Sequence, residues 1–248
     1  IYYVTMENSF NRFCNNLLKL SLVRLVFSVP DNATTDQKSP MPSNLLPGKK
    51  APIVTDIWVV FKTHFDLGFT DLPENVFKRY REEMMENALT VIEKNRMRPK
   101  EKRFAWTVSG WPLEAQMLGP LQTPERKARI EKAIKEGTIV AHALPFTMYT
   151  ESLDYEDLVR GLGFSSAVAR KYGVPLPISA KMTDVPSHSW ILPTLLKNAG
   201  IQFLQLGCNP ASQYPRFPEL FWWEGADGSK VLCNYTPLYG SDIKPTPN

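Results

Sequence analysis

The sequence predicts an α/β protein whose strands are mostly parallel. From Ile53 onward, short apolar runs alternate with longer segments that carry apolar residues at helical spacing. Alternation over four to five such units implies a parallel sheet, either open or closed into a barrel. The 248 residues are 43% apolar and 22% charged, which is the composition of a globular protein with a sizeable core.

The first 52 residues are placed outside this fold. Residues 17–29 are apolar but contain two basic residues, which the core of a signal peptide normally lacks. Residues 30–52 are rich in Pro, Ser, Thr, Asn and Lys, as flexible linkers are. We therefore expect an N-terminal extension with a Pro/Ser-rich linker over residues 1–52, and a single domain over residues 53–248.

The domain is expected to open with a buried strand over residues 53–62 and a helix over residues 73–95. The strand is predicted from its apolar run. Asp71 is the expected N-cap of the helix, Pro73 suits the first turn, and Glu74 stands at the spacing of a capping box. Apolar side chains recur every four residues along the helix, at Val76, Tyr80, Met84, Ala88 and Ile92.

Two further strand–helix units follow. Residues 103–109 and 138–144 have the strand pattern, a helix starts at Thr123 between them, and another helix is expected over residues 154–172. A proline follows Thr123 at the first helical position, and a glycine follows the last turn of each helix. Both are ordinary signals for where a helix starts and stops.

The remaining elements complete the alternation. Residues 177–183 and 201–206 are expected as strands, separated by a helix over residues 190–199 that a glycine ends. Residues 219–235 are predicted to form a hairpin around an Ala-Asp-Gly-Ser turn at residues 226–229.

Composition also argues against several classes of function. The net charge of +4 is small, and basic residues alternate with glutamates on helical stretches such as residues 78–86, which favours a solvated surface over nucleic-acid binding. No run of 18 apolar residues is present, so no membrane span is expected. Three cysteines without Cys-x-x-Cys spacing indicate neither a disulfide framework nor a thiolate zinc site.

The candidate chemistry lies just after two of the expected strands. His64 and Asp66 follow the first strand and, being two residues apart, share a face if the backbone stays extended. Asp184 and His188 follow the fourth strand. His64, Asp66 and Asp184 together form an N/O/O set suited to zinc or a similar ion, one ligand short of a closed tetrahedral site. The alternative is that His64 only caps a strand and Asp66 closes a turn, while His142 is expected to be a core residue.

Three segments carry a resemblance to a known family. They are residues 64–69, His-Phe-Asp-Leu-Gly-Phe; residues 184–189, Asp-Val-Pro-Ser-His-Ser; and the hairpin at residues 221–229, Phe-Trp-Trp-Glu-Gly-Ala-Asp-Gly-Ser. Their order and rough spacing over residues 53–245 resemble the N-terminal catalytic domain of glycoside hydrolase family 38, the α-mannosidase family. The resemblance implies a (β/α)7-type barrel of the glycoside hydrolase/deacetylase kind, incomplete in this chain.

The resemblance also implies a mechanism. It assigns one zinc ion to His64, Asp66 and Asp184, and makes Asp184 the nucleophile of a retaining hydrolase that acts on terminal sugars of glycans or oligosaccharides. Phe69 stands where the family has a Trp that stacks on the sugar, and Glu151 and Asp242 are expected to contact substrate. The family's acid/base and fourth zinc ligand come from downstream segments, so this chain alone is expected to be inactive.

Some positions depart from the family pattern, and other functions stay open. Residues 185–187, Val-Pro-Ser, replace Pro-Phe-Gly after the nucleophile, and residues 206–209, Leu-Gly-Cys-Asn, stand where the family has an Arg, which leaves the sugar undecided. The alternatives are a metal-dependent carbohydrate deacetylase and a truncated, non-catalytic sugar-binding homologue. A carbohydrate is the expected partner. The oligomeric state is open, and a secreted or periplasmic setting is slightly favoured over a cytoplasmic one.

Overall fold

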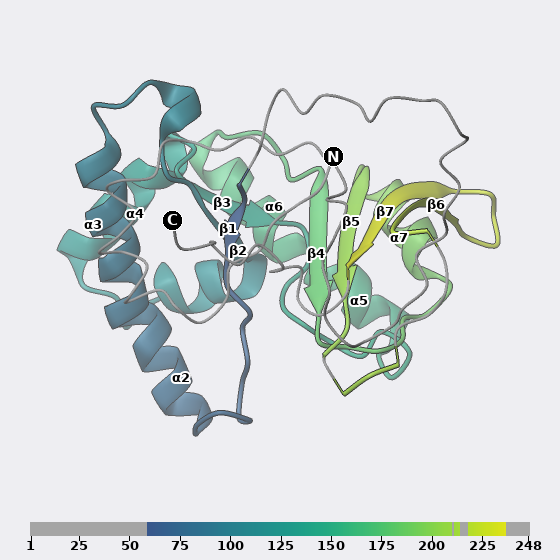
Figure 1. The fold of residues 1–248 in the computed structure, drawn as a ribbon. Coiled ribbons are helices and arrows are strands. Elements are labelled where there is room, and N and C mark those ends of the chain that lie inside the picture. The colour runs from purple at the N-terminus through teal and green to yellow at the C-terminus, as the bar shows by residue number, and fades with distance from the viewer. Residues whose placement is uncertain (1–58, 210, 214–217, 237–248) are drawn as a thin grey trace, which may run out of the picture.

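The computed structural model describes residues 59–209, 211–213 and 218–236, and they form an α/β fold with two sheets (Figure 1). The first sheet has the order β1-β2-β3 and the second the order β4-β5-β7-β6. All neighbouring strands are parallel except β6 and β7, which form an antiparallel hairpin. The strands are β1 (Phe61–Lys62), β2 (Trp106–Ser109), β3 (Ile139–His142), β4 (Ser179–Thr183), β5 (Phe203–Gly207), β6 (Leu220–Glu224) and β7 (Lys230–Thr236).

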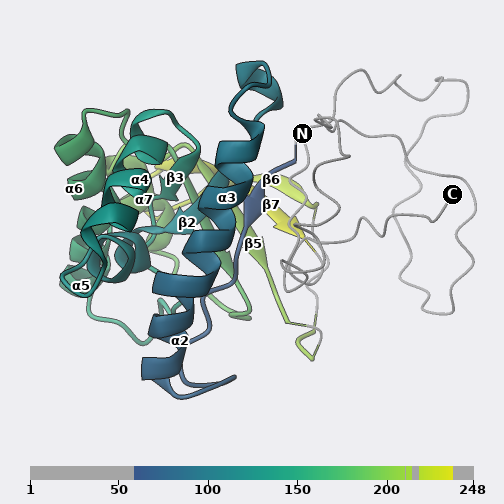
Figure 2. The ribbon, with the colours of Figure 1, turned by 90° about the vertical axis from the view of Figure 1, so that its left-hand side faces the viewer.

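The helices lie between the strands, as the alternating pattern predicts. The first expected helix is continuous but contains a π-helical turn, and Figure 2 shows it as one long rod alongside the first sheet. The segments are α2 (Pro73–Arg79), η2 (Tyr80–Met84), α3 (Met85–Asn95), η3 (Lys100–Lys102), η4 (Pro112–Met117), α4 (Pro124–Lys135), α5 (Tyr155–Gly161), α6 (Gly163–Tyr172) and α7 (Leu192–Asn198).

The sheets of the described chain are not closed, so the expected (β/α)7 barrel is not confirmed. The two sheets do meet: the Ala143 N–H donates to the Ser179 carbonyl at 2.9 Å, which joins the end of β3 to the start of β4. On the other side, Lys62 Nζ donates to Gln205 Oε1 at 2.5 Å and links β1 to β5. The coarser prediction, an α/β fold with mostly parallel strands, is confirmed.

Each sheet has its own hydrophobic core. The first core packs β1–β3 against α3, α4 and their neighbours, and Trp106 on β2 is fully buried in it. Trp111 is half-buried beside this core, in edge-to-face contact with Phe65, Phe77 and Phe146. The second core lies around β4, β5 and β7 and buries Leu192 and Leu196 of α7 completely.

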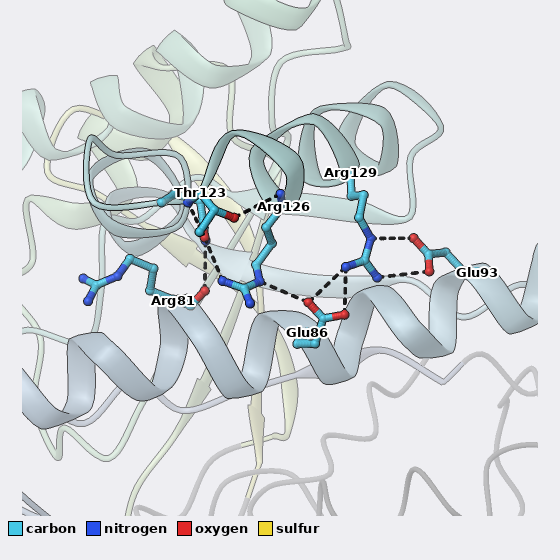
Figure 3. A network of polar contacts seen from close by, with 7 residues as sticks. Arg81, Glu86, Glu93, Thr123, Arg126 and Arg129 are labelled. Atoms are coloured by element: carbon cyan, nitrogen blue, oxygen red, sulfur yellow. Dashed lines mark hydrogen bonds and ion pairs between the residues drawn. The ribbon is translucent and has the colours of Figure 1, made fainter.

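A charged network holds α3 to α4 on the outer surface (Figure 3). The guanidinium of Arg129 binds both Glu86 and Glu93, at 2.7 and 2.8 Å, and Arg126 Nε donates to Glu86 at 3.1 Å. These contacts keep the pKa of Glu86 below its ordinary value, against the opposing effect of burial. The network fixes the long helix against the helix that covers the first sheet.

Local signals for helix ends were partly confirmed. The Thr123 side chain caps α4 by accepting from the Arg126 N–H at 3.3 Å, and Asp154 caps α5 in the same way. Asp71 is not the N-cap that its spacing to Glu74 predicts, because α2 begins one residue later, after Leu72. Asp71 instead accepts from the Leu72 N–H at 2.7 Å and from Asn75 Nδ2 at 2.9 Å.

Other predicted boundaries need small corrections. The single helix expected over residues 154–172 is divided at Leu162 into α5 and α6, and it ends at Gly173, whose φ of 67° is left-handed. The predicted strands are shorter than their apolar runs, and residues 53–58 of the first one lie outside the described residues, as does the extension over residues 1–52. Among the described helices, none has the length and apolar character needed to cross a membrane.

Candidate active site

The structure brings His64 and Asp184 together from the two sheets. His64 comes two residues after β1, and Asp184 immediately follows β4. His64 Nε2 lies 3.3 Å from Asp184 Oδ2, and the two side chains are 11% and 32% exposed. Residues 120 positions apart in the sequence therefore share one site at the carboxyl ends of their strands, where α/β proteins place their chemistry.

Neighbouring residues hold His64 in place. The hydroxyl of Tyr80 donates to the His64 carbonyl at 2.6 Å, and the ring of Tyr80 packs edge-to-face on Phe65. Thr183 Oγ1 lies 3.4 Å from His64 Nδ1. Because Nδ1 faces Thr183, the other ring nitrogen, Nε2, is the one that faces Asp184.

Burial and nearby cations keep the His64 imidazole neutral. Burial lowers its pKa to about 4, and the positive charge of Lys181 acts in the same direction, whereas Asp184 acts against them. A neutral imidazole is the form that binds a metal ion. At neutral pH, His64 is therefore in its metal-binding state.

Two buried lysines lie close behind this histidine. Lys62 on β1 donates to Gln205 on β5, and Lys181 Nζ lies 3.3 Å from the Thr63 carbonyl. Gln205 Nε2 in turn donates to Thr236 Oγ1 at 3.0 Å. This polar network ties the strands beneath the site to one another, and it places positive charge where a sequence pattern of apolar strands predicts none.

Asp66 lies near enough to Asp184 to interact with its charge. Burial raises the pKa of Asp66, and the negative charge of Asp184 raises it further. The described residues nevertheless contain no group of three or more His, Cys, Asp or Glu side chains arranged to hold a metal ion. The structure thus joins His64 with Asp184 but does not complete the N/O/O set with Asp66.

The His64–Asp184 pair can be tested against the geometry of a metal site. Two ligands of a tetrahedral zinc ion with bonds near 2 Å are separated by about 3.3 Å, which equals the separation between His64 Nε2 and Asp184 Oδ2. The donor types, imidazole nitrogen and carboxylate oxygen, also suit zinc. These two residues therefore fit two positions of a zinc site, and the others have to come from elsewhere.

The backbone of Asp184 adopts a conformation that side-chain-bearing residues rarely adopt. Its φ is 78°, and no other non-glycine residue among those described has a positive φ. Such backbone strain persists where surrounding contacts enforce it, and it is common at functional sites. The contacts come from the end of β5 and the loop after it, since the Asp184 N–H donates to the Gly207 carbonyl at 2.9 Å and Asn209 Nδ2 donates to the Asp184 carbonyl at 3.3 Å.

A second group of polar residues connects the loops that follow β3 and β4. Thr150 Oγ1 accepts from the Ser189 N–H at 2.8 Å and lies 3.5 Å from His188 Nδ1. Ser187 Oγ donates to Glu151 Oε2 at 2.7 Å. Burial lowers the pKa of His188 to about 4, so this imidazole is neutral as well. Glu151 is thus exposed at the same end of the fold as Asp184, and it is held by Ser187, three residues after Asp184 in the sequence.

The remaining candidate residues are placed as follows. Phe69 is 90% exposed in the loop before α2. His142 is buried at the end of β3, as expected, with Nε2 3.1 Å from Ser109 Oγ. Asp242 lies outside the described residues.

Sequence reasoning missed Tyr80, Thr150 and Asn209. Their roles depend on contacts between distant segments. The sequence signal that could have pointed to them is that each lies in a segment following a strand, since polar residues after parallel strands often line a site.

Comparison with protein families places the chain. The model of the family described as "Glycosyl hydrolases family 38 N-terminal domain" matches residues 54–246. The chain belongs to this family. The match spans both sheets and all the candidate residues. A comparison with curated proteins gave no match.

Two solved structures have a similar fold. An α-mannosidase from Enterococcus faecalis V583 aligns with 71% of this chain at 20% identity and a TM-score of 0.57. A glycosyl hydrolase family 38 protein from Enterococcus faecalis aligns with 71% at 20% identity and a TM-score of 0.50. The aligned region is only 19% and 18% of those chains, so this family 38 chain spans about a fifth of their length.

Proposed function

We propose that the native protein is a metal-dependent, retaining glycoside hydrolase of the α-mannosidase type, acting on terminal sugars of glycans or oligosaccharides. The observation that carries this proposal is the meeting of His64 and Asp184, 3.3 Å apart after two strands, in a family 38 chain. The activity named for one protein of similar fold, an α-mannosidase, is consistent with it.

Asp184 is the proposed nucleophile. Its carboxylate attacks the anomeric carbon as the glycosidic C–O bond breaks, and the leaving oxygen takes a proton from a second carboxyl group. Water then hydrolyses the glycosyl ester, which restores the Asp184 carboxylate and releases the sugar with its anomeric configuration retained. The partial exposure of this side chain supports the role, because the attacking oxygen has to be reached by a sugar.

His64, Asp66 and Asp184 are the proposed holders of one zinc or similar divalent ion, with a further ligand from outside the described residues. When bound, the ion would supply a contact for vicinal hydroxyls of the sugar and help orient the ring. Its charge would also remove the mutual repulsion of the two carboxylates, which raises the pKa of Asp66 in the free site. Phe69, Glu151 and Asp242 are proposed as sugar contacts.

Metal analysis of the native protein tests the ligand assignment. The purified protein should contain zinc or a similar ion, and His64→Ala should lose it. His142→Ala is the matched control, because His142 is a buried imidazole whose Nε2 contacts Ser109 Oγ. Equal metal content per folded molecule in the two variants would remove His64 from the metal site.

Covalent labelling tests the mechanism. A slow fluoroglycoside should trap an ester on Asp184, detectable by mass spectrometry of the digested protein, and Asp184→Asn should abolish turnover. Asp66→Asn should lower activity without moving the label. A label on another residue, or a product of inverted configuration, would overturn the assignment. Release of acetate from an acetylated sugar without glycosidic cleavage would favour a deacetylase.

A further inference from the structure

Asp184 is held from the end of the neighbouring strand by two hydrogen bonds. The Asp184 N–H belongs to the peptide group before its Cα, and it donates to the carbonyl of Gly207, the last residue of β5. The Asp184 carbonyl belongs to the peptide group after its Cα, and it accepts from Asn209 Nδ2. Since each flanking peptide plane carries one bond, both backbone dihedrals of Asp184 are constrained by the end of β5 and the loop that follows it.

The side-chain amide of Asn209 forms hydrogen bonds through both its nitrogen and its oxygen. Its Nδ2 group donates to Asp184, while its Oδ1 accepts from the Ala211 N–H at 3.0 Å and from Ser212 Oγ at 3.1 Å. The Oδ1 bonds order the loop that carries Asn209, so the Nδ2 donor is presented to Asp184 by a short, self-bonded turn. A side chain with an acceptor alone can form this turn but cannot bond Asp184.

The left-handed conformation decides where the Asp184 carboxylate points. A φ of 78° is unfavourable for a residue with a Cβ, and relaxation to an extended backbone would turn the Cα–Cβ bond away from its present direction. The carboxylate would then leave its position 3.3 Å from His64 Nε2. Of these two hydrogen bonds, the one from Asn209 is made by a side chain and is therefore open to substitution.

We propose that Asn209 is a positioning residue for the nucleophile: its Nδ2 donor keeps Asp184 in the left-handed conformation that aims the carboxylate into the site. This inference rests on the proposed function, because it matters for turnover only if Asp184 attacks the sugar. It assigns a role to a position where the resemblance to the family indicated only a missing Arg. Asn209 itself does not touch the substrate or the reacting atoms in this proposal.

The test compares variants that separate the two sides of the amide. Asn209→Asp keeps an oxygen acceptor for the loop and, because an ionised carboxylate only accepts, removes the donor to Asp184. Ser212→Ala is the matched control, because it removes a bond to Oδ1 and leaves the donor in place. For each variant of the native protein we would measure the rate of covalent labelling by the slow fluoroglycoside, kcat, KM, zinc content and melting temperature.

Asn209→Asp is expected to reduce kcat and the labelling rate by about 10- to 100-fold, because a displacement near 1 Å costs that much in a reaction that depends on orientation. KM and the melting temperature are expected to stay close to those of Ser212→Ala, which should itself turn over at the wild-type rate. A role confined to loop stability would instead lower both variants together. If Asn209→Asp does not fold, Asn209→Ala, which also lacks the donor, replaces it in the test.

The possible failures are distinguishable. Wild-type labelling rate in a folded variant without the donor overturns the positioning role of Asn209 while leaving Asp184 as nucleophile. A label found away from Asp184, or turnover that survives in Asp184→Asn, refutes the proposed function and this inference with it. Equal losses in Asn209→Asp and Ser212→Ala would show that Asn209 serves only the stability of its loop.

Discussion

Acidification should destabilise this protein well before its carboxylates titrate, because His142 is buried, and His64 and His188 are partly buried, in their neutral form. Burial lowers the pKa from 6.5 to about 4 for His64, about 3 for His142 and about 4 for His188. In the unfolded chain these groups regain their ordinary pKa. Between pH 6.5 and 4 the unfolded state therefore binds more protons than the folded state, and the free energy of unfolding falls as the pH falls.

The size of the effect follows from the number of protons. Each proton taken up on unfolding changes the free energy of unfolding by about 1.4 kcal/mol per pH unit. Three histidines acting between pH 7 and pH 5 contribute about 5 kcal/mol, a large part of the 5–15 kcal/mol typical of a domain. Glu86 loses its stabilising contacts only below its ordinary pKa of 4.5, and the raised pKa of Asp66 acts in the opposite direction near 3.8.

Urea unfolding at several pH values between 7 and 5, with a metal chelator present, measures this directly. The chelator matters because a bound metal would add its own pH dependence to the slope. His142→Gln is the informative variant, since it removes the most deeply buried of the three imidazoles and should reduce the slope by about one third. A free energy of unfolding that stays constant from pH 7 to 5, or a variant with the wild-type slope, would refute the reasoning.

Three further predictions concern stability and can be measured by denaturant unfolding. Leu196→Ala should cost about 2–5 kcal/mol, because Leu196 of α7 is fully buried and the cavity it leaves cannot collapse completely. Arg129→Ala should cost about 1 kcal/mol, and less at high salt, since its contacts with the two glutamates lie at the surface. Gly163→Ala in α6 should stabilise by about 0.5–1 kcal/mol, whereas Gly173→Ala should destabilise by about 1–2 kcal/mol, because only Gly173 has a left-handed φ. The opposite order in this pair would contradict the argument.

Local signals in the sequence predicted the elements of this fold well. Thr123 with its following proline and the left-handed Gly173 act within a few residues of themselves, so their meaning does not depend on the rest of the chain. Asp71 failed as a predicted N-cap because α2 begins two residues after it, at Pro73, while its carboxylate accepts hydrogen bonds from the Leu72 N–H and from Asn75 Nδ2. The closure of a sheet depends on which strands pair at its edges, and no local pattern contains that information.

The candidate site could be predicted from the sequence only in part. His64 and Asp184 could be paired because polar residues after parallel strands meet at one edge, and the structure places them together. The contribution of Asn209 could not be foreseen, because it depends on the left-handed backbone of Asp184. The burial of Lys62 likewise depends on Gln205, a partner 143 residues away in the sequence.

The long sequence separations in the polar interior have a consequence for how the protein folds. The contact of His64 with Thr183 spans 119 residues, and the link from Lys62 to Gln205 spans 143. Contacts of such high order form late and slowly, because the entropy of closing the intervening loop has to be overcome first. During synthesis the first sheet can collapse with α3 and α4 before β4 and β5 have left the ribosome. During this interval His64 and Lys62 would lack their partners from β4 and β5 and would stay at a partly covered sheet edge. The folding intermediate would therefore expose the surface on which the site later forms.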